Sequence, residues 1–378
     1  MTSSVPGPSG SSISEVANGV ALGVAGHGFG SGHRLPDRLM RDADFSELLD
    51  LAGRHRLLGA VAEVVASREL PVTDEQRALL AEHHVRWMTQ ALRVERLLLR
   101  IDECLSREGV ETRVLKGVAL AHHVYPDPAW RVFSDLDLLV ASRQFDAATR
   151  VARDELNGTQ PVPELRPGFD REFGKEALVR VDGVELDLHR TFVAGPFGLT
   201  VDLERLFDDS TPFHVGGRRF QALGPNAMFL HACYNAALGD YPLRLCALRD
   251  LLVVHESLTI DHDSIVAMAQ DWRATAVVQR AAEITVDALE LGESHSLAPL
   301  AALKVDRGEA RLLRSYLTPA RSYRRQLASL AVIPGVRARL RYARALVRPS
   351  REYLRSRGWD ERGHVRRALD GLRGHRRD

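Results

Sequence analysis

Residues 132–140 hold two aspartates, Asp135 and Asp137, inside an otherwise apolar run, VFSDLDLLV. The β-branched and aromatic residues around the pair predict a β-strand. Side chains on a strand alternate between its two faces, so both carboxylates project from the same face. Two like charges side by side on a half-buried strand repel each other unless a bound cation, a shared proton or open water offsets them. The pattern therefore indicates either a metal-binding strand or a solvated edge strand with two exposed acids.

A lysine and a glycine, Lys116 and Gly117, end a short apolar segment upstream of this pair. We expect that segment to be a strand and residues 118–125 to form a helix. A glycine at a strand-to-helix turn lets backbone N–H groups approach a phosphate, and a helix N-terminus favours negative charge. Lys116 can neutralise phosphate charge, and Arg131 can grip phosphate with two donors. The segment thus predicts a phosphate site, to which we also assign Ser134.

Residues 177–189 have the alternating pattern of a β-hairpin with Asp182 and Gly183 as its two-residue turn. Asp187 lies on the return strand, on the same face as Glu185. If this strand neighbours the strand of the aspartate pair, three carboxylates surround one site, which is typical of two-metal phosphoryl or nucleotidyl transfer. His189 shares that face, where it either orients substrate and moves a proton or has a structural role.

The motifs LKG, RVFSDLDLLV and VELDLH resemble those of the uncharacterised nucleotidyltransferase family, within the polymerase-β-like nucleotidyltransferase superfamily, over about residues 40–260. The resemblance implies an α+β fold, in which a small mixed sheet with helices is flanked by N- and C-terminal helical lobes. It also implies that Gly117 contacts a nucleoside triphosphate (NTP), that Asp135 and Asp137 hold two Mg²⁺ ions, and that Asp187 completes the metal site.

We therefore predict a Mg²⁺-dependent nucleotidyltransferase that moves a nucleoside monophosphate from an NTP donor to an unknown small-molecule, peptide, protein or RNA acceptor. The predicted catalytic and metal-binding residues are Asp135, Asp137 and Asp187, and the predicted nucleotide-binding residues are Lys116, Gly117, Arg131 and Ser134. Val118 stands where the superfamily usually has serine. This departure leaves a second hypothesis open, a catalytically weak relative that binds a nucleotide or a partner protein.

The chain of 378 residues divides by sequence pattern into five parts. The first is rich in Ser and Gly, which predicts disorder, and the last is rich in Arg. The expected parts are a disordered leader (1–34), a helical N-terminal lobe (35–109), a nucleotidyltransferase-like catalytic domain (110–224), a helical C-terminal lobe (225–318) and a basic tail (319–378).

Charge is distributed unevenly along the chain. Residues 321–378 contain 17 Arg against five acidic residues, a charge of +12, so the rest carries −11 within a total of +1. Such asymmetry favours an acidic partner, which is a nucleic acid, an anionic membrane face or an acidic peptide, unless the tail is simply solvated. Tyrosines between the arginines suit base stacking, so nucleic-acid binding through 321–378 is a third hypothesis.

The three cysteines, Cys104, Cys233 and Cys246, lack metal-site or disulfide spacing. A sparse, odd count favours a reducing compartment, and we expect a cytoplasmic protein. No apolar run approaches the roughly 20 residues that span a bilayer.

Overall fold

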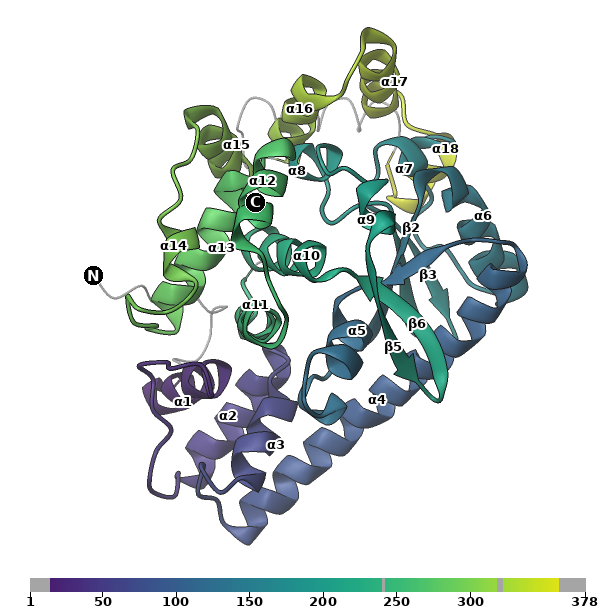
Figure 1. Ribbon diagram of the computed structural model, residues 1–378. Coiled ribbons are helices and arrows are strands. Elements are labelled where there is room, and N and C mark those ends of the chain that lie inside the picture. The colour runs from purple at the N-terminus through teal and green to yellow at the C-terminus, as the bar shows by residue number, and fades with distance from the viewer. Residues whose placement is uncertain (1–13, 240–241, 318–321, 360–378) are drawn as a thin grey trace.

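The computed structural model describes residues 14–239, 242–317 and 322–359 (Figure 1). A six-stranded mixed sheet has the strand order β3-β4-β2-β1-β6-β5. The strands are β1 (Thr112–Val114), β2 (Asp135–Val140), β3 (Glu176–Val181), β4 (Val184–His189), β5 (Ser210–Val215) and β6 (Arg218–Leu223).

Two hairpins form the outer strands of this sheet, and the inner strands are joined by longer connections. The turn residues Asp182 and Gly183 both have positive φ, 50° and 79°, as a two-residue hairpin turn between twisted strands requires. The predicted β3–β4 hairpin is therefore confirmed. β2 pairs in parallel with β4 and antiparallel with β1, which places the two strands that carry the predicted acids side by side.

Helices of the N-terminal lobe lead into the sheet. The longest of them, α4, packs against β2 and β4, and Figure 1 shows it running along the sheet. The side chain of Thr73 and that of Gln76 form the predicted capping box at its start. These helices are α1 (Glu15–Ala25), α2 (Asp42–Arg54), α3 (Leu58–Ala66) and α4 (Asp74–Arg107).

Short helices connect the strands. The expected helix over 143–156 is interrupted, because a 3₁₀ turn precedes it and a π-helical turn ends it. The connecting elements are α5 (Lys116–His123), η1 (Pro128–Trp130), η2 (Ser142–Gln144), α6 (Phe145–Arg150), η3 (Val151–Glu155), α7 (Phe169–Glu172), α8 (Pro196–Leu199) and α9 (Arg205–Asp208).

The C-terminal lobe is helical, as predicted. Helix α10 begins with Pro225 at its first turn and ends before Gly239, and it packs against α11 and α13. The helices of this lobe are α10 (Pro225–Leu238), α11 (Leu245–Ser257), α12 (His262–Asp271), α13 (Thr275–Ala288), α14 (Ala298–Ala301) and α15 (Arg307–Leu317). The helices that follow it are α16 (Ser322–Val332), α17 (Val336–Val347) and α18 (Arg351–Ser356).

The prediction of a disordered leader over 1–34 is wrong for residues 14–34, and residues 1–13 lie outside the described part. Ser14 caps α1 by accepting from the Ala17 amide, and its hydroxyl donates to Asp44 of α2 at 2.9 Å. The buried face of α1 consists of small residues such as Ala17 and Ala21, which let it pack closely on α2 and α11. The Ser and Gly content of residues 1–34 predicted disorder, whereas the small residues of α1 suit close helix packing.

The basic tail predicted over 319–378 contains three helices within the described residues. Helix α16 packs on α8, and the buried ring of Tyr342 from α17 stacks on Phe169 of α7 with ring centroids 5.7 Å apart. The described part of the tail is therefore folded onto the part of the chain that contains the sheet. Among the helices described, none has the length and apolar character to cross a membrane.

Candidate active site

The parallel pairing of β2 with β4 sets the positions of the predicted acids. In this register Asp137 lies opposite Asp187, and Asp135 lies opposite Glu185. Residues directly opposite on neighbouring strands project from the same face and lie close together. The structure thus brings the aspartate pair and the third acid together on one face of the sheet.

Asp137 is the buried centre of this group, with 2% of its surface exposed. Its Oδ1 atom lies 2.8 Å from Lys116 Nζ and 2.7 Å from His189 Nε2. Burial alone would raise the pKa of Asp137, but the Lys116 ammonium and the His189 ring hold it well below its usual range. In turn, the carboxylates of Asp137 and Asp135 outweigh burial and raise the pKa of Lys116. Asp137 and Lys116 are therefore both charged.

The Asp187 carboxylate lies near other acids, and they disfavour its charged form. Burial, followed by the nearby carboxylates of Glu176 and Asp137, raises its pKa to about 7. Its Oδ1 atom is buried and has no hydrogen-bond partner among the described residues. A buried carboxylate oxygen without a donor is unfavourable unless a cation or a proton reaches it, so this atom fits a metal ion.

One ligand atom each from Asp137, Asp187 and His189 lie within 4.8 Å of one another, a spacing that suits metal coordination. His189 is fully buried, and its Nε2 atom also lies 3.4 Å from the Glu176 carboxylate. In the tautomer that donates from Nε2 to these carboxylates, the same nitrogen cannot also coordinate a cation. The group consequently offers a hard cation two carboxylates, with His189 orienting one of them.

Asp135 has a different partner, Arg56, which the sequence analysis did not identify. The Arg56 guanidinium donates to Asp135 Oδ1 at 3.1 Å and to the Ser134 hydroxyl at 3.1 Å. Arg56 follows α2 and has a positive φ of 56°. Nothing in the sequence around position 56 links it to residues 134–135, because only the packing of the N-terminal lobe on the sheet brings them together.

The segment Lys116–Val118 forms the first turn of α5. A Cβ atom at Gly117 would come within 3.0 Å of the Phe133 Cβ, so the glycine lets α5 pack closely beside the chain that enters β2. Val118, which stands where the superfamily usually has serine, is 1% exposed, and its side chain packs in the core. The phosphate-binding role predicted for Gly117 remains a prediction.

Arg131 lines the cleft beside the acids, but its guanidinium is paired within the protein. Its Nε and Nη2 atoms donate to the two carboxylate oxygens of Asp250 at 2.7 and 2.8 Å, and Tyr125 donates to the same carboxylate at 2.8 Å. Arg131 and Asp250 are 4% and 2% exposed. The guanidinium fork is thus engaged by a buried carboxylate, and the phosphate-binding role predicted for Arg131 remains a prediction.

A cleft of about 420 Å³ opens beside the acids, between the sheet, α10 and α11, and the C-terminal helices. Asp135, Glu185 and Asp187 line it together with a larger number of cations. Because the cations outnumber the acids, the cleft suits a polyanion. The cations are Arg56, Lys116, Arg131, Lys175, Arg244 and Arg325.

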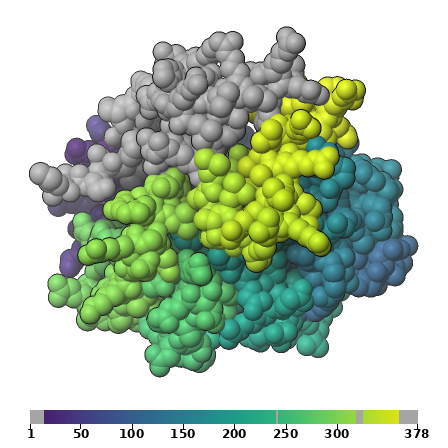
Figure 2. Space-filling model, turned by 90° about the horizontal axis from the view of Figure 1, so that it is seen from above, coloured from purple at the N-terminus to yellow at the C-terminus, as the bar shows by residue number. Residues whose placement is uncertain are grey.

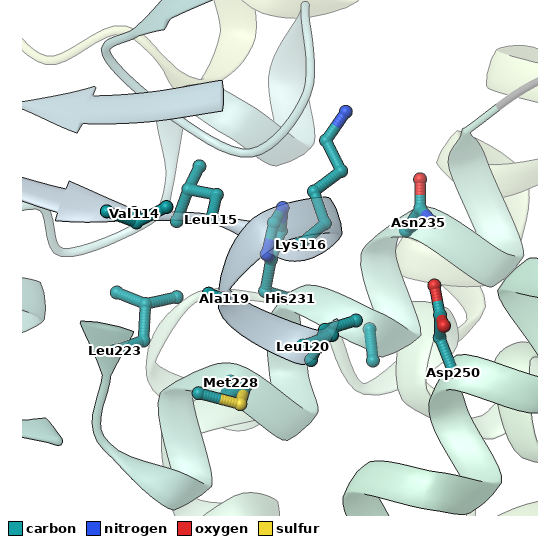
Figure 3. A pocket seen from close by; sticks show the side chains of 11 residues that line it. Val114, Leu115, Lys116, Ala119, Leu120, Leu223, Met228, His231, Asn235 and Asp250 are labelled. Atoms are coloured by element: carbon teal, nitrogen blue, oxygen red, sulfur yellow. The ribbon is translucent and has the colours of Figure 1, made fainter. Parts of the chain in front are cut away.

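Figure 3 shows a small pocket that adjoins the cleft between α5 and α10. Lys116 extends from the start of α5, and His231 and Asn235 project from α10 towards the same region. All three residues line both the pocket and the cleft. Burial, followed by the Lys116 charge, lowers the pKa of His231 to about 3, so this ring is neutral.

The far wall of the cleft comes from the C-terminal helices. The Arg325 guanidinium lies 3.7 Å from the Tyr316 ring centroid and donates to the Tyr316 carbonyl oxygen at 2.8 Å. Lys175, immediately before β3, also lines the cleft and forms an ion pair of 2.6 Å with Glu176. Sequence reasoning did not single out any of these residues, since basic residues are frequent in the chain and only the fold selects those that face the acids.

A comparison with curated proteins found no similar sequence. Among solved structures, an antigenic nucleotidyltransferase-like protein from Paracoccidioides brasiliensis is similar at 15% identity and a TM-score of 0.33, over 54% of this chain and 96% of that one. A family model described as "uncharacterised nucleotidyltransferase" matches residues 41–290, which include α2–α13 and all six strands. The chain therefore belongs to the uncharacterised nucleotidyltransferase family.

Proposed function

We propose that this protein transfers a nucleoside monophosphate from an NTP to an acceptor hydroxyl or phosphate, with release of pyrophosphate. The observation that carries the proposal is the in-register pair of Asp137 and Asp187 at the edge of a basic cleft. Nucleotidyl transfer depends on positioning and on charge stabilisation. It therefore needs carboxylates that bind metal ions, next to basic side chains that bind the phosphates.

In this proposal Asp137 and Asp187 hold Mg²⁺, and Asp135 joins them so that two ions are bound. Bound Mg²⁺ supplies charge neutralisation at the phosphates and favours ionisation of the acceptor hydroxyl. The buried, unpartnered Oδ1 atom of Asp187 supports this assignment. Lys116 and Arg56 neutralise Asp137 and Asp135 in the structure, and both also line the cleft within reach of a polyanion.

The other residues of the site bind and orient. His189 fixes the carboxylate of Asp137, to which it donates. Lys175 and Arg325, which both line the cleft, supply positive charge for the triphosphate. Asp187, which lines the cleft, receives the proton of the acceptor hydroxyl. The protein acts in the cytoplasm in this proposal, which the three buried free cysteines support.

A second candidate, nucleotide binding without turnover, is favoured by one observation. Asp137 and Asp135 already have cationic partners of the chain itself, Lys116 and Arg56. Such internal neutralisation replaces part of the charge that a metal ion would bring. In this case the cleft binds an NTP through its cations and no pyrophosphate is released.

Calorimetry with ATP, GTP, CTP and UTP, with and without Mg²⁺, tests both candidates when it is combined with an assay of pyrophosphate release. We expect one nucleotide to bind in a Mg²⁺-dependent way. We expect Asp187→Asn to lower that affinity at least tenfold and to abolish release. Asp154→Asn is the matched control, since it removes a carboxylate on the exposed surface.

Mg²⁺-dependent transfer that persists in Asp187→Asn would contradict the proposed mechanism. Tight nucleotide binding without pyrophosphate release, across a set of small-molecule, peptide and RNA acceptors, would favour the second candidate. No binding of any of the four nucleotides would exclude both.

A further inference from the structure

Helix α17 presents an apolar stripe to solvent. Val336, Leu340 and Val347 are 71%, 63% and 62% exposed, and they are among the most exposed large apolar side chains of the described residues. At roughly 100° per residue, these positions and Ala343 fall within an arc of about 60° on the helix. A continuous exposed stripe of this kind, unlike scattered apolar residues, indicates an interaction surface.

The opposite face of α17 anchors the helix to the protein. Tyr342 and Ala345 are 4% and 3% exposed, and Tyr342 packs edge-on against Phe173 of α7 with ring centroids 5.2 Å apart. Tyr342 and Ala345 lie roughly 130° and roughly 170° around the helix from the middle of the stripe. The stripe therefore faces outwards from a docked helix. Figure 2 looks onto the surface where the C-terminal helices lie.

Arginines border the stripe on both sides. Arg337 and Arg344 lie on one flank and Arg339 on the other, and all three are exposed. The sequence from 322 to 351 contains eight Arg and no acidic residue. On this helix Arg341 forms an ion pair with Glu172 of α7 at 2.9 Å, which strengthens the docking and leaves the flanks positive.

We propose that α17 docks the protein on an anionic lipid bilayer, with Val336, Leu340 and Val347 inserted at the headgroup level. An interfacial helix needs an apolar face and basic flanks, because the aliphatic side chains enter the acyl boundary while the arginines reach the lipid phosphates. The stripe is aliphatic throughout, whereas binding of single-stranded nucleic acid uses aromatic side chains for stacking. This surface lies outside the family match at 41–290, and the inference does not depend on nucleotidyl transfer.

Co-sedimentation of the full chain with vesicles tests the inference. We expect binding to vesicles of phosphatidylcholine with phosphatidylglycerol at least tenfold tighter than to phosphatidylcholine alone, and weaker binding at high salt. A variant with Ser at Val336, Leu340 and Val347 is expected to lose about tenfold or more. Arg337→Gln with Arg344→Gln is expected to lose roughly thirtyfold on the anionic vesicles.

The matched control replaces three exposed apolar residues of α4, Leu79, Val85 and Leu92, by Ser and should bind vesicles as the wild type does. Absence of binding to anionic vesicles overturns the inference, and so does equal loss in the control. Binding of single-stranded RNA that needs the arginines but tolerates the serine triple variant, in a protein that ignores vesicles, would assign the surface to nucleic acid instead.

Discussion

At the scale of single residues, one carboxylate of the site, that of Asp187, lies in an electrostatically unfavourable environment. Asp137 is fully compensated by Lys116 and His189, whereas Asp187, directly opposite, has a buried oxygen without a donor. Burial and the neighbouring acids raise the pKa of Asp187 to about 7. Groups with strongly shifted pKa values are concentrated at functional sites, where an arrangement that serves binding or chemistry lowers the stability of the fold.

Asp187→Asn should therefore stabilise the protein in the absence of metal, in a way that depends on pH. The folded state keeps the Asp187 proton up to about pH 7, while the unfolded chain loses it near its ordinary pKa of about 3.9. Wild-type stability thus falls as pH rises through this window, and the advantage of Asn grows to about 4 kcal/mol above pH 7. Urea denaturation in EDTA at several pH values measures it.

Glu185→Gln is the control for this experiment, because Glu185 lies on the same strand but its side chain is 44% exposed and paired with Arg180. Its effect should stay within about 0.5 kcal/mol at every pH. An Asp187→Asn advantage that does not change between pH 4 and pH 8 would show that Asp187 titrates normally.

At the scale of elements, the acidic strand is fixed in place by close packing of the chain that precedes it. Helix α3 packs on η1, which leads into β2. A Cβ atom at Gly59 of α3 would lie 2.4 Å from the carbonyl oxygens of both Ala129 and Trp130. Backbone atoms cannot turn away as side chains do, so this contact requires glycine.

Gly59→Ala should destabilise the protein by about 1–3 kcal/mol or more, since α3 or η1 has to shift. Gly19→Ala in α1 is the matched substitution, because a Cβ there meets nothing within 4 Å. It should stabilise the protein by about 0.5–1 kcal/mol through helix propensity. Thermal denaturation compares the two, and similar effects of both substitutions would contradict the packing argument.

At the scale of the whole molecule, buried ion pairs join the region around the sheet to the helical lobes. Arg131, next to β2, is held by Asp250 of α11. Arg249 of the same helix donates to the carbonyl oxygens of Val24 and His27 at the end of α1, and it pairs with Glu63 of α3. Helix α11 therefore connects the sheet with the N-terminal lobe.

Asp250→Ala should cost about 3–5 kcal/mol, because it leaves the Arg131 charge buried without a partner. The double variant Arg131→Met/Asp250→Leu removes both charges and should recover most of this stability.

The double variant should also bind nucleotide as tightly as the wild type, since the Arg131 guanidinium is held by Asp250. Denaturation and nucleotide titration of both variants measure these effects. A well-folded double variant that has lost nucleotide binding would support the phosphate-binding role predicted for Arg131.

The sequence by itself determined the local features of this protein. The hairpin at Asp182–Gly183, the capping box at Thr73 and the shared face of Asp135 and Asp137 follow from φ preferences and from the two-residue period of a strand. The motifs in 112–140 and around Asp187 were also sufficient to indicate the family that the match at 41–290 establishes.

Only the tertiary structure decided which charges meet. It paired Arg56 with Asp135, which is 79 residues away, and Arg131 with Asp250, which is 119 residues away. It also placed Arg325 in the wall of the cleft. It also docked α1, which composition had assigned to disorder. The physical reason is that backbone conformation is set by neighbours in sequence, whereas the partner of a charged side chain depends on how distant elements pack, and a lone arginine carries no signal of that partner.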